Sequence, residues 1–145
     1  MSGMGGRAVV AARAWIGTPY RHQASCRGAG TDCLGLLRGI WREIYGAEPE
    51  PVVAYTPDWG EPQGEEILWA AARRHLVEKA PEAAAPGDVL LFRMRDAGIA
   101  KHLGLQGRVG AAASFIHAYS GHGVVESPFS APWARRVVAR FALPE

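Results

Sequence analysis

The chain opens with apolar residues at helical spacing. Within residues 7–15, Val9, Ala12 and Trp15 follow one another at intervals of three, and the pattern stops at Gly17. An α-helix turns once every 3.6 residues, so these three side chains share one face. The stretch therefore predicts a first helix with one buried face.

A stronger helical pattern spans residues 32–46. One face collects the apolar side chains Cys33, Leu37, Ile40, Trp41 and Ile44. Thr31 or Asp32 can cap this helix at its N-terminus, and Gly46 is suited to end it. The pattern predicts a second helix that buries Cys33 in its first turn.

Two loops and a third helix fill the middle of the chain. The polar, glycine-containing residues 20–31 predict a loop before the second helix. Residues 47–64 contain repeated prolines and glycines and predict a loop. Its aromatic side chains indicate that the loop packs against the rest of the protein. Residues 65–79 are amphipathic at helical spacing and predict a helix that Pro81 stops.

After residue 86 the pattern changes from helical to extended. Short apolar stretches separated by glycine turns predict strands at 88–94, 102–106, 114–120, 123–129 and 135–143. Helices come first and strands afterwards, without βαβ alternation. This order predicts an α+β fold in which an antiparallel sheet carries the helices on one face, built as one domain over residues 1–145.

Composition narrows the class of protein. The chain has 145 residues, of which 48% are hydrophobic and 21% charged, which is typical of a globular protein with a core. The net charge is +2 and the basic residues are dispersed, so we expect no nucleic-acid partner. No apolar run reaches the ~18 residues of a membrane span, so we expect no membrane insertion.

The N-terminus does not match a signal peptide, because Arg13 interrupts its apolar stretch. This predicts synthesis and folding in the cytoplasm. The chain has two cysteines, Cys26 and Cys33, and no zinc-ligand spacing. We therefore expect neither a disulfide scaffold nor a zinc site.

Three residues are candidates for chemistry. Cys33 begins a helix, where the helix dipole and free N–H groups favour a thiolate, although a buried cysteine can also be a small apolar side chain. His102 opens a predicted strand and can take a thiol proton, or it is a surface histidine at a strand edge. His117 lies inside a later strand and is either a core group or the polar residue that orients the base. The order cysteine, histidine, polar residue is that of papain-like thiol hydrolases.

Five segments resemble the NlpC/P60 family of cell-wall cysteine peptidases, in the family's order. The resemblance runs from about residue 10 to about residue 126, and its segments are WIGTPY, TDCLGLLR, PGDVLLF, KHLGL and FIHA. Residues 52–76 are in addition similar to the phage-tail and gene-transfer-agent branch. The resemblance implies a papain-like fold.

The resemblance also implies roles for individual residues. Cys33 would be the nucleophile, His102 the general base and His117 the residue that orients the base. Tyr20 matches a tyrosine near the oxyanion, and Asp32 matches an aspartate that helps to shape the substrate groove.

The roles of several other residues are less definite. Gly35 matches a small residue that lets the helix pack against the sheet, and Cys26 matches no family role. Tyr119 or His122 could compete with His117, because the stretch between His102 and His117 is longer than the family's shortest. His22 could touch substrate, and His75 is expected to be exposed.

The implied substrate is peptidoglycan, cut in its stem peptides between γ-D-glutamyl and a diamino acid. The branch implies delivery in a phage-like particle through tail hub or baseplate proteins. Two rivals remain: an amidase or acyltransferase on the same scaffold, and an idle tail or wall-binding module. The groove around Tyr20, His22 and Trp59 would distinguish the enzymes.

Overall fold

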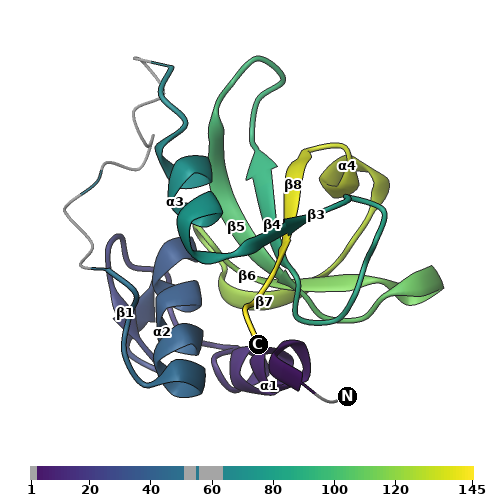
Figure 1. Ribbon diagram of the computed structural model, residues 1–145. Coiled ribbons are helices and arrows are strands. Elements are labelled where there is room, and N and C mark those ends of the chain that lie inside the picture. The colour runs from purple at the N-terminus through teal and green to yellow at the C-terminus, as the bar shows by residue number, and fades with distance from the viewer. Residues whose placement is uncertain (1–2, 51–54, 56–63) are drawn as a thin grey trace.

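The computed structural model describes residues 3–50, 55 and 64–145 (Figure 1). Helices dominate the first half of the chain and strands the second half. In chain order the elements are α1 (Gly3–Ala14), β1 (Ser25–Cys26), β2 (Gly30–Thr31), α2 (Cys33–Tyr45), α3 (Ile67–His75), β3 (Val77–Lys79), β4 (Val89–Arg93), β5 (Ala100–Gln106), the 3₁₀ turn η2 (Gly110–Ala112), β6 (Ser114–Tyr119), β7 (Gly123–Pro128), α4 (Ala131–Ala134) and β8 (Val137–Ala142).

Six of the strands form one antiparallel sheet in the order β3-β8-β4-β5-β6-β7. The sheet is strongly bent, so that β6 and β7 run across the direction of β4 and β5 (Figure 1). The predicted α+β fold, with N-terminal helices on an antiparallel sheet, is confirmed. The five predicted strands correspond to β4 to β8.

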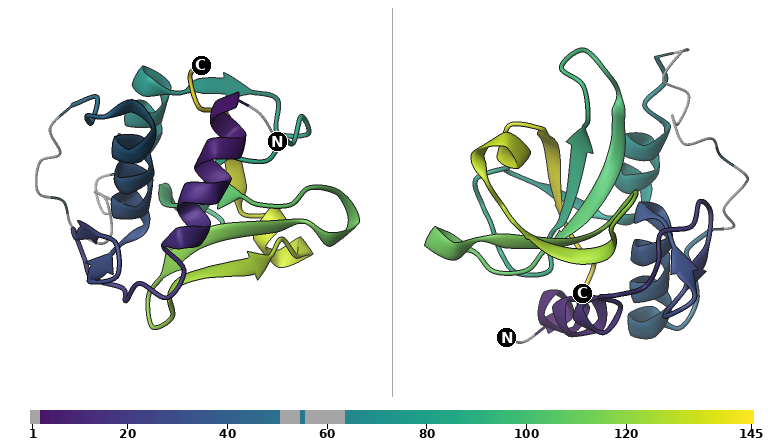
Figure 2. Two further views of the ribbon diagram at one scale, coloured as in Figure 1. Left: turned by 90° about the horizontal axis from the view of Figure 1, so that it is seen from below. Right: turned by 180° about the vertical axis from the view of Figure 1, so that it is seen from behind.

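The sheet has an apolar cluster on each face, because successive strand residues point to opposite sides. On β4, Val89 and Leu91 belong to the larger core that includes residues of α1, α2 and α3. Leu90 and Phe92 belong to a smaller cluster, against which Trp133 of α4 packs. The three N-terminal helices thus lie on one side of the sheet and α4 on the other (Figure 2). The prediction that the helices lie on one face holds for the predicted helices α1 to α3, whereas the short helix α4, which the sequence pattern did not predict, lies on the other face.

The second helix follows its sequence signals closely. Asp32 is the N-cap, and its carboxylate accepts a hydrogen bond from the Gly35 backbone N–H at 2.7 Å. Gly46 ends the helix with φ 93°, a left-handed conformation that glycine adopts without strain. Of the two caps that the sequence allowed, Asp32 is the one used. The caps place Cys33 at the first position of the helix.

Two local predictions are corrected. The helix predicted over residues 65–79 ends at His75, and Val77–Lys79 instead pairs with β8 as strand β3. Pairing with a distant strand overrides the helical pattern there. Residues 20–31, predicted as a loop, contain the two-stranded hairpin β1–β2. Most of the loop predicted at 47–64 lies outside the described residues.

Candidate active site

His102 and His117 meet on the sheet face that carries the smaller apolar cluster. His102 Nε2 lies 2.8 Å from His117 Nδ1, a hydrogen-bond distance. The two side chains come from β5 and β6, which pair only through Leu105–Ile116 and Gln106–Phe115. The strands then separate, as the crossing of β5 and β6 in Figure 1 shows. The separation leaves room for two imidazole rings between strands that are neighbours in the sheet.

Ser127 extends this contact, and the sequence reasoning missed it. His117 Nε2 lies 2.9 Å from Ser127 Oγ on β7. In the β6–β7 register Phe115 pairs with Ser127 and His117 with Val125, so His117 and Ser127 are diagonal neighbours on one face. The sequence carries a signal for this contact only once the hairpin register is known.

Aromatic rings close over both histidines. Trp133 of α4 lies 5.8 Å from the His102 ring and 5.2 Å from the His117 ring, and Phe92 lies 5.5 Å from His102, centroid to centroid. Burial, with a smaller effect from the neighbouring His117, lowers the pKa of His102 to about 3. Burial likewise lowers the pKa of His117 to about 4, with a smaller effect from His122. Both imidazoles are therefore neutral at neutral pH.

Tyr119 and His122, which could compete with His117 as the residue that orients the base, make no direct hydrogen bond to His102 among the described contacts. The Tyr119 ring stacks on His117 at 5.4 Å and is 6.0 Å from the His102 ring. His122 is exposed in the turn after β6 and stacks on Tyr119 at 5.2 Å. Of these three residues, only His117 has a hydrogen bond to His102 among the described contacts.

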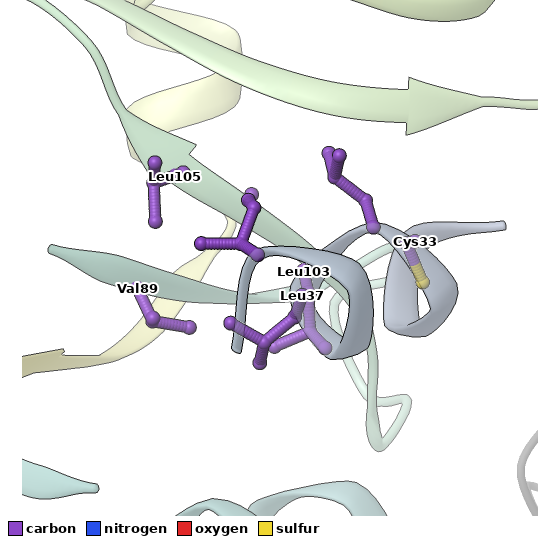
Figure 3. Close-up of a pocket in the computed structure, with 8 residues that line it drawn as sticks. Cys33, Leu37, Val89, Leu103 and Leu105 are labelled. Atoms are coloured by element: carbon purple, nitrogen blue, oxygen red, sulfur yellow. The ribbon is translucent and has the colours of Figure 1, made fainter. Parts of the chain in front are cut away.

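Cys33 lies against β5 on the helix side of the sheet. It lines an apolar pocket between α2 and strands β4 and β5, together with Leu36, Leu37, Ile40, Val89, Leu103, Gly104 and Leu105. Figure 3 shows Cys33 at one end of this row of side chains, with Val89 and Leu105 at the other. Leu103 directly follows His102, so the cysteine contacts the same stretch of β5 that presents the candidate base.

The surroundings of Cys33 favour the neutral thiol. Burial, followed by the charge of Asp32, raises the pKa of Cys33 to about 12, although backbone N–H groups of Leu103, Leu34 and Cys33 itself act in the opposite direction. The prediction that the start of the helix makes Cys33 a resting thiolate is therefore wrong. Loss of water outweighs the helix dipole, whose effect is modest. Among the described residues, no hydrogen bond joins the thiol to either imidazole.

Asp32 serves the local structure around Cys33. Its carboxylate accepts hydrogen bonds from the backbone N–H of Gly35 and of Gln23, both at 2.7 Å, and from the Tyr55 hydroxyl. His22 Nδ1 lies 3.7 Å from the same carboxylate. With these partners Asp32 is only 2% exposed and holds the residues before the helix against its first turn.

Tyr20 lies near enough to Cys33 and Asp32 to interact with them electrostatically. It bridges to Thr31 just before the helix and is half-buried. Burial, then the charges of Cys33 and Asp32, raise the pKa of Tyr20 to about 12. The phenol is therefore protonated at neutral pH and can donate a hydrogen bond.

Three further expectations can be compared with the structure. A Cβ on Gly35 would collide with the Ala24 carbonyl of the hairpin segment, so this glycine lets the helix approach the hairpin rather than the sheet. Cys26 is exposed on β1. His75 is partly buried against Glu50, so the expectation that it is exposed is wrong.

The described residues contain no cluster of three or more histidine, cysteine or acidic side chains that could hold a metal ion. In the same part of the chain, every helix is too short or too polar to cross a bilayer.

Comparison with known proteins identifies the fold. No family model matches the sequence, and no curated protein does. Among solved structures, the NlpC/P60 domain of the peptidoglycan hydrolase SagA is 21% identical with a TM-score of 0.64, covering 96% of this chain and 98% of that domain.

Two larger proteins share the same fold. An NLP/P60 family protein similar to lipoprotein, from Staphylococcus aureus, is 18% identical with a TM-score of 0.66, covering 98% of this chain and 42% of its own. An NlpC/P60 family protein from Bacillus cereus is 18% identical with a TM-score of 0.64, covering 97% of this chain and 40% of its own. This chain therefore spans less than half the length of either protein. The architecture of α1 to β8 is that of NlpC/P60 domains.

Proposed function

We propose that this chain is a cysteine peptidase that hydrolyses peptide bonds in peptidoglycan stem peptides. Cys33 is the nucleophile, His102 the general base and His117 the residue that orients the base. The observation that carries the proposal is the 2.8 Å contact between two buried imidazoles, one of them adjacent along β5 to the residues that line the Cys33 pocket. The shared fold supports it, because the SagA domain belongs to a peptidoglycan hydrolase.

The first step couples attack to proton transfer. A thiol with a pKa near 12 and an imidazole with a pKa near 3 do not form a resting ion pair. The thiol proton therefore moves to His102 Nδ1 as the sulfur–carbon bond forms, and the carbonyl π electrons move onto oxygen. His102 Nε2–H donates to His117 Nδ1, which stabilises the imidazolium.

The oxyanion is held by the Cys33 backbone N–H and the Tyr20 hydroxyl. The raised pKa of Tyr20 keeps its proton in place, so the group acts as a donor. Cys33 is the first residue of α2, and Tyr20 lies in the chain segment that leads into this helix. The oxyanion then collapses, the carbon–nitrogen bond breaks, and His102 gives its proton to the leaving amine.

Water completes the cycle. It attacks the thioester while His102 Nδ1 takes its proton, and the thiol leaves with that proton as the carboxylic acid is released. No metal or organic cofactor takes part in these steps. We propose the bond between γ-D-glutamyl and the diamino acid as the one cleaved, on the resemblance of the sequence segments alone.

Digestion of purified sacculi, followed by mass spectrometry, tests the proposal. New amine termini within stem peptides support an endopeptidase. Intact stems freed from glycan indicate the amidase alternative, and stems joined to an added amine acceptor indicate an acyltransferase. Absence of products supports an idle module. We expect Tyr20 and His22 to select among these substrates, and Trp59, the third expected groove residue, lies outside the described residues.

We also propose delivery by a phage-like tail, through hub or baseplate proteins. The support is the similarity of residues 52–76 to the phage-tail branch. Co-purification of the chain with tail proteins from producing cells is the expected result. Recovery of the chain only as a free monomer would count against it.

A further inference from the structure

Ser127 ends a hydrogen-bonded chain that begins at His102. His102 Nε2 lies 2.8 Å from His117 Nδ1, and His117 Nε2 lies 2.9 Å from Ser127 Oγ. Burial keeps both imidazoles neutral near pH 7, since it lowers their pKa values to about 3 and about 4. A neutral imidazole has one N–H and one nitrogen lone pair, so the protons of this chain have only two arrangements.

In the first arrangement His102 Nε2–H donates to His117 Nδ1, and His117 Nε2–H donates to Ser127 Oγ. His102 Nδ1 then has a lone pair. In the second arrangement every donor is reversed: Ser127 donates to His117 Nε2, His117 Nδ1–H donates to His102 Nε2, and His102 Nδ1 carries a proton. Only the first arrangement leaves His102 able to accept a proton at Nδ1.

The proposed function requires the first arrangement. Within the described part of the chain no hydrogen bond reaches His102 Nδ1, and this nitrogen is not one of the fully buried side-chain atoms that lack a partner, so water can reach it. Its lone pair is open to a proton donor only while His102 Nε2–H donates to His117. Ser127 is only partly buried, so its hydroxyl proton can reach water while its oxygen accepts from His117.

We propose that Ser127 is a positioning residue. By accepting the His117 Nε2 proton, it holds both imidazoles in the tautomers that leave a lone pair on His102 Nδ1. The consequence for catalysis rests on the proposed function, in which that nitrogen takes the thiol proton. The consequence for the tautomers does not depend on any substrate.

Nitrogen-15 NMR of the histidine rings tests the tautomers directly, because a ring nitrogen that carries a proton resonates far from one with a lone pair. In the wild-type protein we expect a protonated Nε2 and an unprotonated Nδ1 on His102. We expect Ser127→Ala to give mixed signals at both rings, and Ser127→Thr, which keeps the hydroxyl, to restore them. A protonated His102 Nδ1 in the wild-type protein overturns the proposal without any variant. Unchanged ring signals in Ser127→Ala also overturn it.

Kinetics on a soluble stem peptide then tests the consequence. A general base contributes ~10²–10⁴-fold, so partial loss of its tautomer should lower kcat about tenfold with little change in KM. Ser130→Ala is the matched control, because Ser130 makes no capping hydrogen bond at α4 and should leave both readouts unchanged. Mixed tautomers with unchanged kcat would overturn the positioning role. An inactive wild-type protein with the expected tautomers would refute the proposed function and still support the role of Ser127 in the hydrogen-bonded chain.

Discussion

His102 Nε2 on β5 lies 2.8 Å from His117 Nδ1 on β6, although the two strands pair only at Leu105 and Gln106. The contact forms where the strands have separated and where Trp133 covers both rings. Two imidazoles are thereby coupled in a buried environment that keeps them neutral. This arrangement ranks the effects expected from their replacement.

His102→Ala should lower turnover by ~10²–10⁴-fold, because it removes the general base. His117→Ala should cost less, because the base remains but loses its hydrogen-bond partner. His122→Ala should leave turnover close to that of the wild-type protein, since His122 stacks on Tyr119 and has no hydrogen bond to His102. The measurement is kcat on a stem peptide. A larger loss of kcat in His122→Ala than in His117→Ala would show that His117 is not the residue that orients the base.

Replacement of the two cysteines should have opposite effects on activity. Cys33→Ser should fold and be inactive, because a hydroxyl is a far weaker nucleophile than a thiol at a site where both imidazoles are neutral. Cys26→Ser should retain activity, since Cys26 is exposed on β1 and lines no part of the pocket. Circular dichroism checks folding and stem-peptide hydrolysis checks activity. Treatment with a chelator should change neither, and loss of activity to the chelator would contradict a thiol mechanism without a metal.

Stability should fall on acidification below the ordinary histidine pKa of 6.5. The folded-state pKa values of His102 and His117 are lowered to about 3 and about 4, so between about pH 6.5 and pH 4 the unfolded chain binds protons that the folded chain does not. Each group then removes up to about 1.4 kcal/mol of unfolding free energy per pH unit. Urea unfolding at a series of pH values measures the slope.

His102→Gln removes one of these two titrating groups and should make the acid-induced loss of stability shallower. Ser130→Ala is the control, because Ser130 is exposed and has no group that titrates in this range, and its slope should match that of the wild-type protein. Equal slopes for His102→Gln and the wild-type protein would mean that His102 is not held neutral.

Two glycines of α2 allow a matched test of packing around the site. Gly35→Ala places a Cβ against the Ala24 carbonyl and the Thr31 hydroxyl, whereas Gly39→Ala places one against the Trp15 ring. Both should destabilise by about 1–3 kcal/mol or more, since each overfills a packed contact. Only Gly35→Ala should also lower kcat, because Gly35 donates to the Asp32 cap beside Cys33. Equal kcat losses at the two positions would mean that the effect is on stability alone.

Local signals account for what the sequence predicted correctly. The periodicity of residues 32–46, the Asp32 cap and the Gly46 stop all act within a few residues, and α2 begins and ends where they indicate. The strands from β4 to β8 likewise follow from alternation and from glycine turns. The helix predicted over 65–79 failed at Val77–Lys79, where pairing with a strand more than sixty residues away decides the conformation.

The sequence by itself determined the α+β class, the place of Cys33 in the first turn of α2, and the order of a cysteine and two histidines along the chain. Only the tertiary structure decided which histidine contacts His102, because that depends on how β5 and β6 separate. It also added Ser127, through the β6–β7 register. The protonation of Cys33 was decided by packing too, since burial removes the water that a thiolate needs and no local motif encodes that loss.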